Sequence, residues 1–200
     1  MVTMHHWKDS DLIGGHVALD FINTVSDVGK SRRETRLATW KDYSDWLAAA
    51  GIERSGTSNG MKVSRSASLA ELHELREISY CVFHELAAGS CPEKEHLDQL
   101  RDYIEEAIRH AELMFVDGEL RWSPQKTDGN SQFHRIVFLI DDLLRGGELH
   151  RLRECGRCTW LFLDTGRGLG RKWCDMRTCG NRAKSESFRY KRLARQPRST

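Results

Sequence analysis

The sequence predicts a mainly α-helical protein of the α+β class, with a helical N-terminal body, one small β-hairpin and a compact C-terminal module. Three observations support this: apolar residues recur at helical spacing through 1–150, two apolar runs flank Asp117-Gly118, and four cysteines gather near the C-terminus. With 39% hydrophobic residues and 3 prolines among 200 residues, the composition excludes a collagen-like or wholly disordered chain.

The helices are predicted from spacing and from their end signals. Val17, Phe21 and Ile22 share one helical face. Thr39 and Ser68 each precede an acidic residue by three positions, which is the spacing of a capping box. Glycines directly after the apolar patterns mark the ends of the predicted helices. Pro92 suits the first turn of the helix predicted to follow it. The predicted helices are 17–24, 39–51, 68–89, 92–111 and 133–144, and in the fourth the inward face is Leu97, Leu100, Ile104, Ile108 and Ala111.

The runs 114–116 and 120–122 flank Asp117-Gly118, a dipeptide typical of tight hairpin turns. They predict the body's one β-hairpin. The longest aliphatic or aromatic run, Ile136 to Ile140, is far shorter than the ~20 residues that cross a bilayer. The first residues also lack the apolar core of a secretory signal. We therefore expect a cytoplasmic protein without a membrane partner.

Charge divides the chain into two parts. The formal net charge is +2, from 31 Lys+Arg against 29 Asp+Glu, yet residues 151–200 hold 14 basic and 4 acidic side chains. Residues 1–150 are left with 17 basic and 25 acidic ones. The net charge is therefore −8 for residues 1–150 and +10 for residues 151–200, which predicts an acidic body followed by a basic module. A basic module predicts a polyanion as its partner, and nucleic acid is the polyanion that we favour. The alternative is a solvated basic tail.

The cysteines of the module have the spacing of zinc ligands. Cys155 and Cys158 form a C-x2-C pair, Cys174 follows after fifteen residues, and Cys179 after four more. Zinc takes four ligands in a tetrahedron, and none of the nine histidines lies in 151–200. We predict one structural Zn2+ bound by these four cysteines. A redox C-x2-C pair is less consistent, since no βαβ setting is apparent.

The residues between the cysteines predict the module's fold. Runs 160–163 and 171–173 resemble the two strands of a hairpin around a glycine-rich turn. A helix would then begin after Cys179 and continue to about Arg195. The result is a knuckle, a β-hairpin and a helix, which is a treble-clef-like arrangement. Trp160, Phe162 and Trp173 would form its core, with Ala183, Tyr190 and Ala194 as the helix face packed against the hairpin.

Residues 151–196 resemble the CGNR zinc finger. The resemblance rests on the cysteines, the flanking aromatic residues and the signature Cys179-Gly180-Asn181-Arg182. The segment 18–24, Ala-Leu-Asp-Phe-Ile-Asn-Thr, and the helix from Asp42 to Gly51 resemble the ABATE domain that usually precedes it. The pair implies a stress-responsive bacterial transcription regulator with a DNA partner, and no enzyme is expected.

The basic residues of the module predict how DNA would be bound. Two basic stripes of the last helix can face a DNA groove, and Arg182 near its start matches guanine O6 and N7. Arg171 and Lys172, beside Cys174, can reach phosphates. The predicted nucleic-acid-binding residues are Arg171, Lys172, Arg182, Lys184, Arg189, Lys191 and Arg192.

The body offers one candidate ligand pocket. Asp20 and Asn23 lie three residues apart on a predicted helix, and with His16 and Arg36 they can bind a small polar effector. We favour the alternative that these are buried polar residues that pin neighbouring segments. The body can also serve as a homodimer interface.

Three other functions stay open at this stage. The first is an adaptor that binds RNA or another protein through a module stabilised by zinc. The second is a body that binds a small ligand, and the third is a regulator whose zinc is released when its thiols are oxidised. Neither a nucleophile–base set nor a phosphate-binding glycine loop is recognisable.

Overall fold

The computed structural model describes residues 7–26, 30–52, 67–116, 118–125, 128 and 130–194, apart from the side chains of 192–194. Within these ranges the protein is mainly helical, as predicted, with three two-stranded antiparallel sheets. The helices are α1 (Val17–Ile22), α2 (Trp40–Ala49), α3 (Leu69–Ala87), α4 (Lys94–Arg109), α5 (Ser131–Arg145) and α6 (Asn181–Ala194). Short 3-10 turns occupy η1 (Asp9–Asp11) and η2 (Leu149–Arg151), and η3 (Met176–Gly180) is a π-helical turn.

The capping boxes predicted for the second and third helices are present. The Thr39 hydroxyl accepts a hydrogen bond from the backbone N–H of Asp42 at 3.2 Å, and the Asp42 carboxylate accepts one from the Thr39 N–H. Ser68 and Glu71 form the same reciprocal pair. Helix α4 begins at Lys94, so Pro92 precedes the helix instead of lying in its first turn as predicted.

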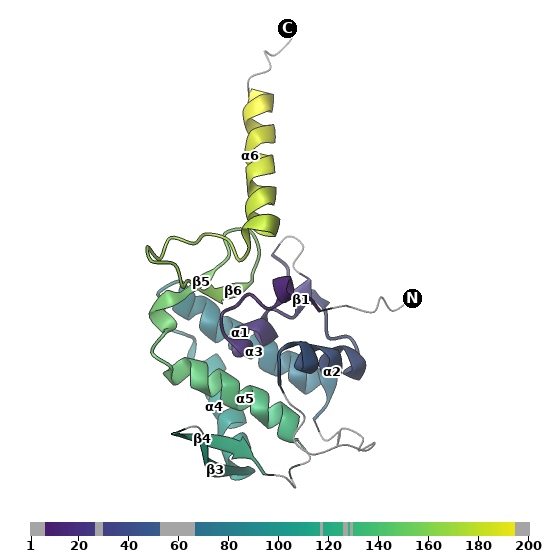
Figure 1. Cartoon of the computed structure of the whole chain (residues 1–200), viewed down its shortest axis with the longest axis vertical. Coiled ribbons are helices and arrows are strands. Elements are labelled where there is room, and N and C mark those ends of the chain that lie inside the picture. The colour runs from purple at the N-terminus through teal and green to yellow at the C-terminus, as the bar shows by residue number, and fades with distance from the viewer. Residues whose placement is uncertain are drawn as a thin grey trace.

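The core lies between α1, α3 and α5, with α1 packed against both of the other helices (Figure 1). Helix α1 is buried over most of its length, because Phe21 and Ile22 are inaccessible to solvent. Helix α4 covers this core through Leu100 and Ala107, but Leu97 and Ile108, predicted to face inward, are 41% and 37% exposed. The core side chains of the three central helices include Leu19, Phe21, Ile22, Leu75, Val82, Phe83, Ile136, Val137 and Ile140.

Three hairpin-like sheets lie at separate places on this core. β1 (Val25–Ser26) pairs with β2 (Glu34–Thr35), and β3 (Ala111–Val116) pairs with β4 (Glu119–Pro124) around the predicted Gly118 turn. Gly118 has φ +86°, a conformation that suits glycine. The β3–β4 hairpin lies at the opposite end of the molecule from α6 (Figure 1).

The hairpin of the C-terminal module differs from the prediction. β5 (Leu152–Glu154) pairs with β6 (Leu161–Leu163), so the first cysteine pair lies in the turn between the two strands. The predicted second strand, 171–173, was wrong: it is not a strand in the structure. The physical reason is that β6 already has its partner in β5, and residues 171–173 are held by separate hydrogen bonds.

The strands β5 and β6 pack on the body. Leu152, Leu161 and Leu163 are buried in the same hydrophobic cluster as α1, α3 and α5. The Trp160 indole N–H donates to the carbonyl of Val25 at 3.2 Å. The hairpin that holds the first two cysteines is therefore attached to the body by burial as well as by the chain, whereas α6 extends away from it (Figure 1).

Candidate metal centre and basic helix

The four clustered cysteines come from three consecutive segments. Cys155 and Cys158 lie in the β5–β6 turn, Cys174 lies in the loop that follows β6, and Cys179 lies in η3. The Cys155 N–H donates to the carbonyl of Trp160 at 2.9 Å, which closes the turn into a knuckle. All four side chains are at most 7% exposed.

The sulfur positions match a tetrahedral zinc site. The four Sγ atoms lie within 4.8 Å of one another, and Cys158 is 3.6 Å from both Cys174 and Cys179. Four sulfurs about 2.3 Å from one Zn2+ would be separated by about 3.8 Å. All four cysteines are free, and a disulfide would require about 2.05 Å between sulfurs.

The electrostatics of the cluster also favour a cation. Hydrogen bonds from Cys158 and Cys174 hold the pKa of Cys155 far below its usual value, whereas the contact with Cys155 raises the pKa values of Cys158 and Cys174. Four buried sulfurs at this distance can all ionise only when a positive ion balances them. The protein therefore has one structural zinc site, with its four positions filled by Cys155, Cys158, Cys174 and Cys179.

A buried carboxylate organises the loop that returns to the third cysteine. Asp164 accepts hydrogen bonds from the N–H groups of Arg171 (2.8 Å) and Gly166 (2.9 Å), which hold its pKa below the usual range. The Arg171 guanidinium donates to the carbonyls of Trp173 and Cys174 and lies 4.3 Å from the ring centroid of Phe162. Arg171, predicted as a phosphate contact, thus braces the loop. An aspartate two residues before a glycine was the available sequence signal for this loop.

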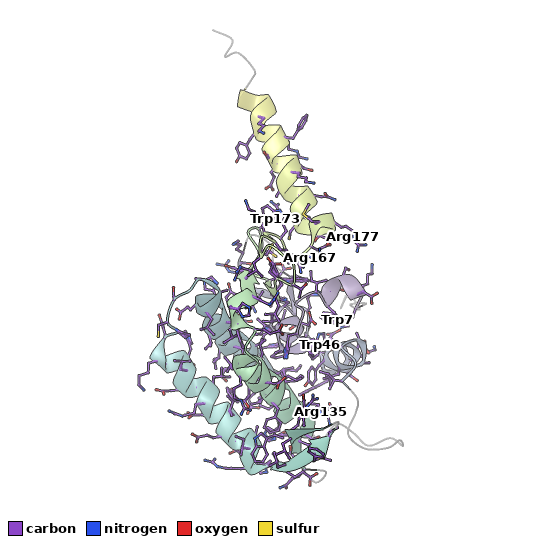
Figure 2. The ribbon with its side chains drawn as sticks, turned by 60° about the vertical axis from the view of Figure 1, so that its left-hand side comes forward. Trp7, Trp46, Arg135, Arg167, Trp173 and Arg177 are labelled. Atoms are coloured by element: carbon purple, nitrogen blue, oxygen red, sulfur yellow. The ribbon has the colours of Figure 1, made fainter. Side chains whose placement is uncertain are left out.

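Two glycines allow the segments around the zinc site to approach closely. A Cβ on Gly156 would lie 3.0 Å from the Trp173 ring, and a Cβ on Gly180 would lie 2.6 Å from the Met176 sulfur. Gly156 also donates its N–H to the carbonyl of Lys172 at 2.9 Å. Figure 2 shows Trp173 at the junction between the body and α6. A Cβ at Gly180, the glycine of the Cys-Gly-Asn-Arg signature, would therefore displace the end of the Met176 side chain.

Helix α6 presents its side chains to solvent. Over 181–191 every side chain is exposed except Ala183, which is intermediate. Figure 2 shows them projecting on several sides of a helix that stands clear of the body. The predicted packing face was wrong, because Tyr190 is 76% exposed. The predicted DNA contacts Lys172, Arg182, Lys184, Arg189 and Lys191 are exposed, and the side chain of Arg192 lies outside the described residues.

Two features of this helix were missed in the sequence. Phe188 is 68% exposed, and at 3.6 residues per turn it falls between the two basic stripes. Arg157 of the knuckle forms a two-pronged ion pair with Glu186, which ties the helix to the zinc site. Such a pair cannot be read from spacing, since its members are 29 residues apart.

The predicted pocket residues Asp20 and Asn23 make contacts within the protein. The Asn23 amide donates to the carbonyl of Leu161 at 2.8 Å and accepts from the Leu161 N–H at 2.9 Å. The Asp20 carboxylate accepts from the Gly14 N–H at 2.8 Å, and the Gly14 carbonyl accepts from the N–H of Leu163. Asn23, which caps the C-terminus of α1, is thus linked to β6 directly, and Asp20 of α1 is linked to it through Gly14.

His16 and Arg36 make their contacts elsewhere. His16 caps α1 by accepting from the Ala18 N–H at 3.2 Å. Arg36 forms an ion pair with Asp11 at 3.0 Å, and its guanidinium lies 4.2 Å from the Trp7 ring centroid. The four predicted residues therefore serve different local structures.

Burial of Asp20 predicts a pH dependence of stability. Burial raises the pKa of Asp20 to about 7, against the opposing effect of the Gly14 N–H, and its ordinary value is 3.8. The folded protein then holds a proton that the unfolded chain releases between these pH values. The free energy of unfolding should fall as pH rises toward 7 and level off above it.

Asp20→Asn should remove this contribution while its Oδ1 still accepts from Gly14. The free energy of unfolding of the variant should rise relative to that of the natural protein by up to about 3 kcal/mol between pH 5 and pH 8, since each pH unit below the pKa of Asp20 contributes about 1.4 kcal/mol. Urea unfolding at a series of pH values measures the difference. Asp102→Asn, at an exposed carboxylate, is the matched control, and an identical pH profile for the two variants would contradict the expectation.

Among the described residues no helix is long and apolar enough to cross a membrane.

Two family models match the chain. The ABATE model, described as a putative stress-induced transcription regulator, matches residues 15–155. The CGNR zinc finger model matches residues 151–192, which contain the four cysteines and most of α6. No curated protein matches the chain.

Proposed function

Because this chain belongs to the ABATE family of putative stress-induced transcription regulators and ends in a CGNR zinc finger, we propose that it is a cytoplasmic bacterial regulator that binds DNA through α6. One observation carries the proposal: α6 is a basic helix that projects from the zinc site, and of its described side chains, 181–191, all but Ala183 are exposed to solvent. Fourteen residues extend about 21 Å, and the major groove, about 12 Å wide, admits a helix.

The helix gains from a partner. A helix of this length is marginal in water by itself, and α6 has little packing along its outer part to stabilise it. The Arg157–Glu186 ion pair and the π-helical turn η3 fix its base. Phosphates on both walls of a groove would pair with its two basic stripes, so that binding would stabilise the helix.

The residues divide by role. Lys184 and Lys191 form one stripe and suit phosphates, whereas Arg182 and Arg189 form the other and can read guanine edges. Phe188, between the stripes, is placed to contact a thymine methyl group.

The zinc ion supports this role structurally. Its four thiolate ligands leave no open position for water, which argues against metal-dependent catalysis, and we propose that the chain is not an enzyme. We assign Asp20 and Asn23 to holding α1 against β6 instead of to an effector pocket, because their polar atoms are bonded to Gly14 and Leu161.

The test replaces three cations of α6 together. The triple variant Arg182→Ala, Lys184→Ala, Arg189→Ala should bind duplex DNA on the order of 100-fold more weakly, with zinc content unchanged. The slope of log K against log salt should also decrease by about 1, since Lys184 is the phosphate contact among the three and each phosphate contact contributes about 0.9. Fluorescence anisotropy with a labelled duplex selected from a random pool gives both values.

The control triple is Lys94→Ala, Arg101→Ala, Arg109→Ala, which removes the same charge from the exposed face of α4. An equal loss in both triples, or unchanged affinity in the first, would contradict the proposal. Tighter binding of RNA than of duplex DNA in competition would favour an RNA adaptor instead.

A further inference from the structure

The β3–β4 hairpin has one face made entirely of apolar side chains. In its antiparallel register Leu113 lies opposite Trp122, and Phe115 lies opposite Leu120. Paired residues of an antiparallel ribbon project from the same face, as do residues two apart on one strand. This apolar face therefore consists of Ala111, Leu113, Phe115, Leu120, Trp122 and Pro124.

Only the base of the apolar face is covered by the body. Pro124 is buried, whereas the exposed fraction is 37% for Trp122, 53% for Leu113, 67% for Leu120 and 72% for Phe115. Exposure thus increases steadily toward the tip. The exposed parts of these four side chains amount to on the order of 400 Å², a size of apolar patch that marks interaction sites on soluble proteins.

A two-stranded ribbon gains from a cover on this face. Such ribbons are marginally stable without a third strand or another packed surface, and here α4 and α5 contact the ribbon but leave the outer part of the apolar face exposed. The opposite face is mixed: charged or polar side chains occupy four of its six positions, Glu119 pairs with Arg121, and the other two positions are Met114 and Val116. The asymmetry between the two faces identifies the apolar one as the surface that requires a partner.

We propose that this apolar face binds the same face of a second copy of the chain. The face contains no charged side chain, so two copies can meet without repulsion, and it offers no charge that would select a different partner. An interface that uses the same patch twice closes after two subunits. The patch supplies about half of the 800 Å² per partner typical of stable complexes, which predicts a dimer that forms at micromolar concentrations.

The location of the hairpin leaves the rest of the molecule free. It lies at the end opposite α6 (Figure 1), so the dimer keeps both basic helices uncovered. This inference goes beyond the proposed function and does not rest on it, because association is measured without nucleic acid.

Sedimentation of the full-length, zinc-loaded protein tests the proposal. The weight-average mass should rise from 23.0 kDa toward twice that value as concentration increases through the micromolar range. Phe115→Thr and Leu120→Thr should each shift the dissociation constant at least tenfold upward. Threonine is chosen because it keeps a high strand propensity, and circular dichroism checks that each variant is folded.

Met114→Thr is the matched control, because Met114 is 40% exposed and lies on the same strand but on the opposite face. It should leave the dissociation constant within twofold of the natural value. A single 23.0 kDa species up to several hundred micromolar would overturn the proposal. A dimer that survives both threonine substitutions, or that Met114→Thr disrupts equally, would overturn it too.

Discussion

Removing zinc is expected to unfold the C-terminal module and to destabilise the helical body with it. Around the metal site the module has a small core, in which Phe162 is the one large buried side chain beside the four cysteines among the described residues. Zinc binding supplies about 10–16 kcal/mol in zinc-finger peptides. Without it, the cysteines would lose their common centre, and η3 would no longer hold the base of α6.

The loss should extend to the body because β5 and β6 belong to both parts. Leu152, Leu161 and Leu163 are buried in the main core, and Asn23 is bonded to the Leu161 backbone. Releasing the knuckle weakens these contacts. We expect the free energy of unfolding to fall by at least about 5 kcal/mol, which lowers the melting temperature by roughly 10–20 °C in a protein of this size.

Two measurements check this expectation. Metal analysis should find one zinc per chain, and chelator titration should lower the α-helical circular dichroism and the melting temperature together. Cys158→Ser should reproduce the loss in zinc buffer, whereas Cys91→Ser, at an exposed cysteine outside the cluster, should melt like the natural protein. Equal melting of the two variants would contradict a stabilising zinc site.

The features that the sequence predicts correctly are local ones. A capping box needs two residues three positions apart, and Thr39 and Ser68 each provide it. The zinc ligands are likewise recognisable because a C-x2-C turn brings two sulfurs to one ion regardless of the surrounding fold. Local chemistry of this kind is already present in the spacing.

The missed features depend on contacts between distant segments. β5 has three residues, too few for an alternating pattern, so β6 was assigned a partner on the wrong side. Asn23 meets Leu161 across 138 residues. Tyr190 lies at a helical spacing typical of a buried face. It is nevertheless exposed, because the hairpin that was predicted to cover it does not form. Periodicity shows which side chains share a face and cannot show what that face meets.

Net charge also overstates how many cations are available for DNA. Arg151, Arg157 and Arg171 count toward the +10 balance of the module. Each already donates within the protein: Arg151 to the Asp164 carbonyl, Arg157 to Glu186, and Arg171 to the loop before Cys174. The charge of a segment follows from its composition, whereas the share of that charge open to a partner follows from the fold.

Arg32 joins the body to the zinc knuckle through one buried guanidinium. Its side chain is 8% exposed and donates to Glu77 at 2.7 Å, to the Ile22 carbonyl at 2.8 Å and to the Thr159 hydroxyl at 3.3 Å. Its guanidinium also lies 3.8 Å from the ring centroid of Tyr80. Thr159 directly follows a zinc ligand, so this one side chain connects α1, α3 and the knuckle.

The charge of Arg32 is balanced by its partner. Burial raises the pKa of Glu77, but Arg32 and Arg76 together outweigh burial and hold that pKa below its usual value. Removing Arg32 would leave Glu77 with Arg76 alone and would strip a donor from the Ile22 carbonyl. Arg32 adopts φ +51°, and alanine at this position would bear the same backbone strain. The difference in stability between the natural protein and Arg32→Ala therefore measures the contribution of the arginine side chain.

Because the Glu77 side chain is 40% exposed and water can replace part of its contact with Arg32, Arg32→Ala is expected to lower the free energy of unfolding by about 2 kcal/mol and the melting temperature by roughly 4–8 °C. Zinc transfer to a coloured chelator should also accelerate, because Thr159 loses its tie to the body. Arg32→Lys should fall between, since a lysine keeps the charge but cannot bridge three acceptors. Arg33→Ala, at the exposed neighbouring position, should change neither melting nor zinc release. If Arg32→Ala melts normally and releases zinc at the natural rate, Arg32 does not couple the body to the knuckle.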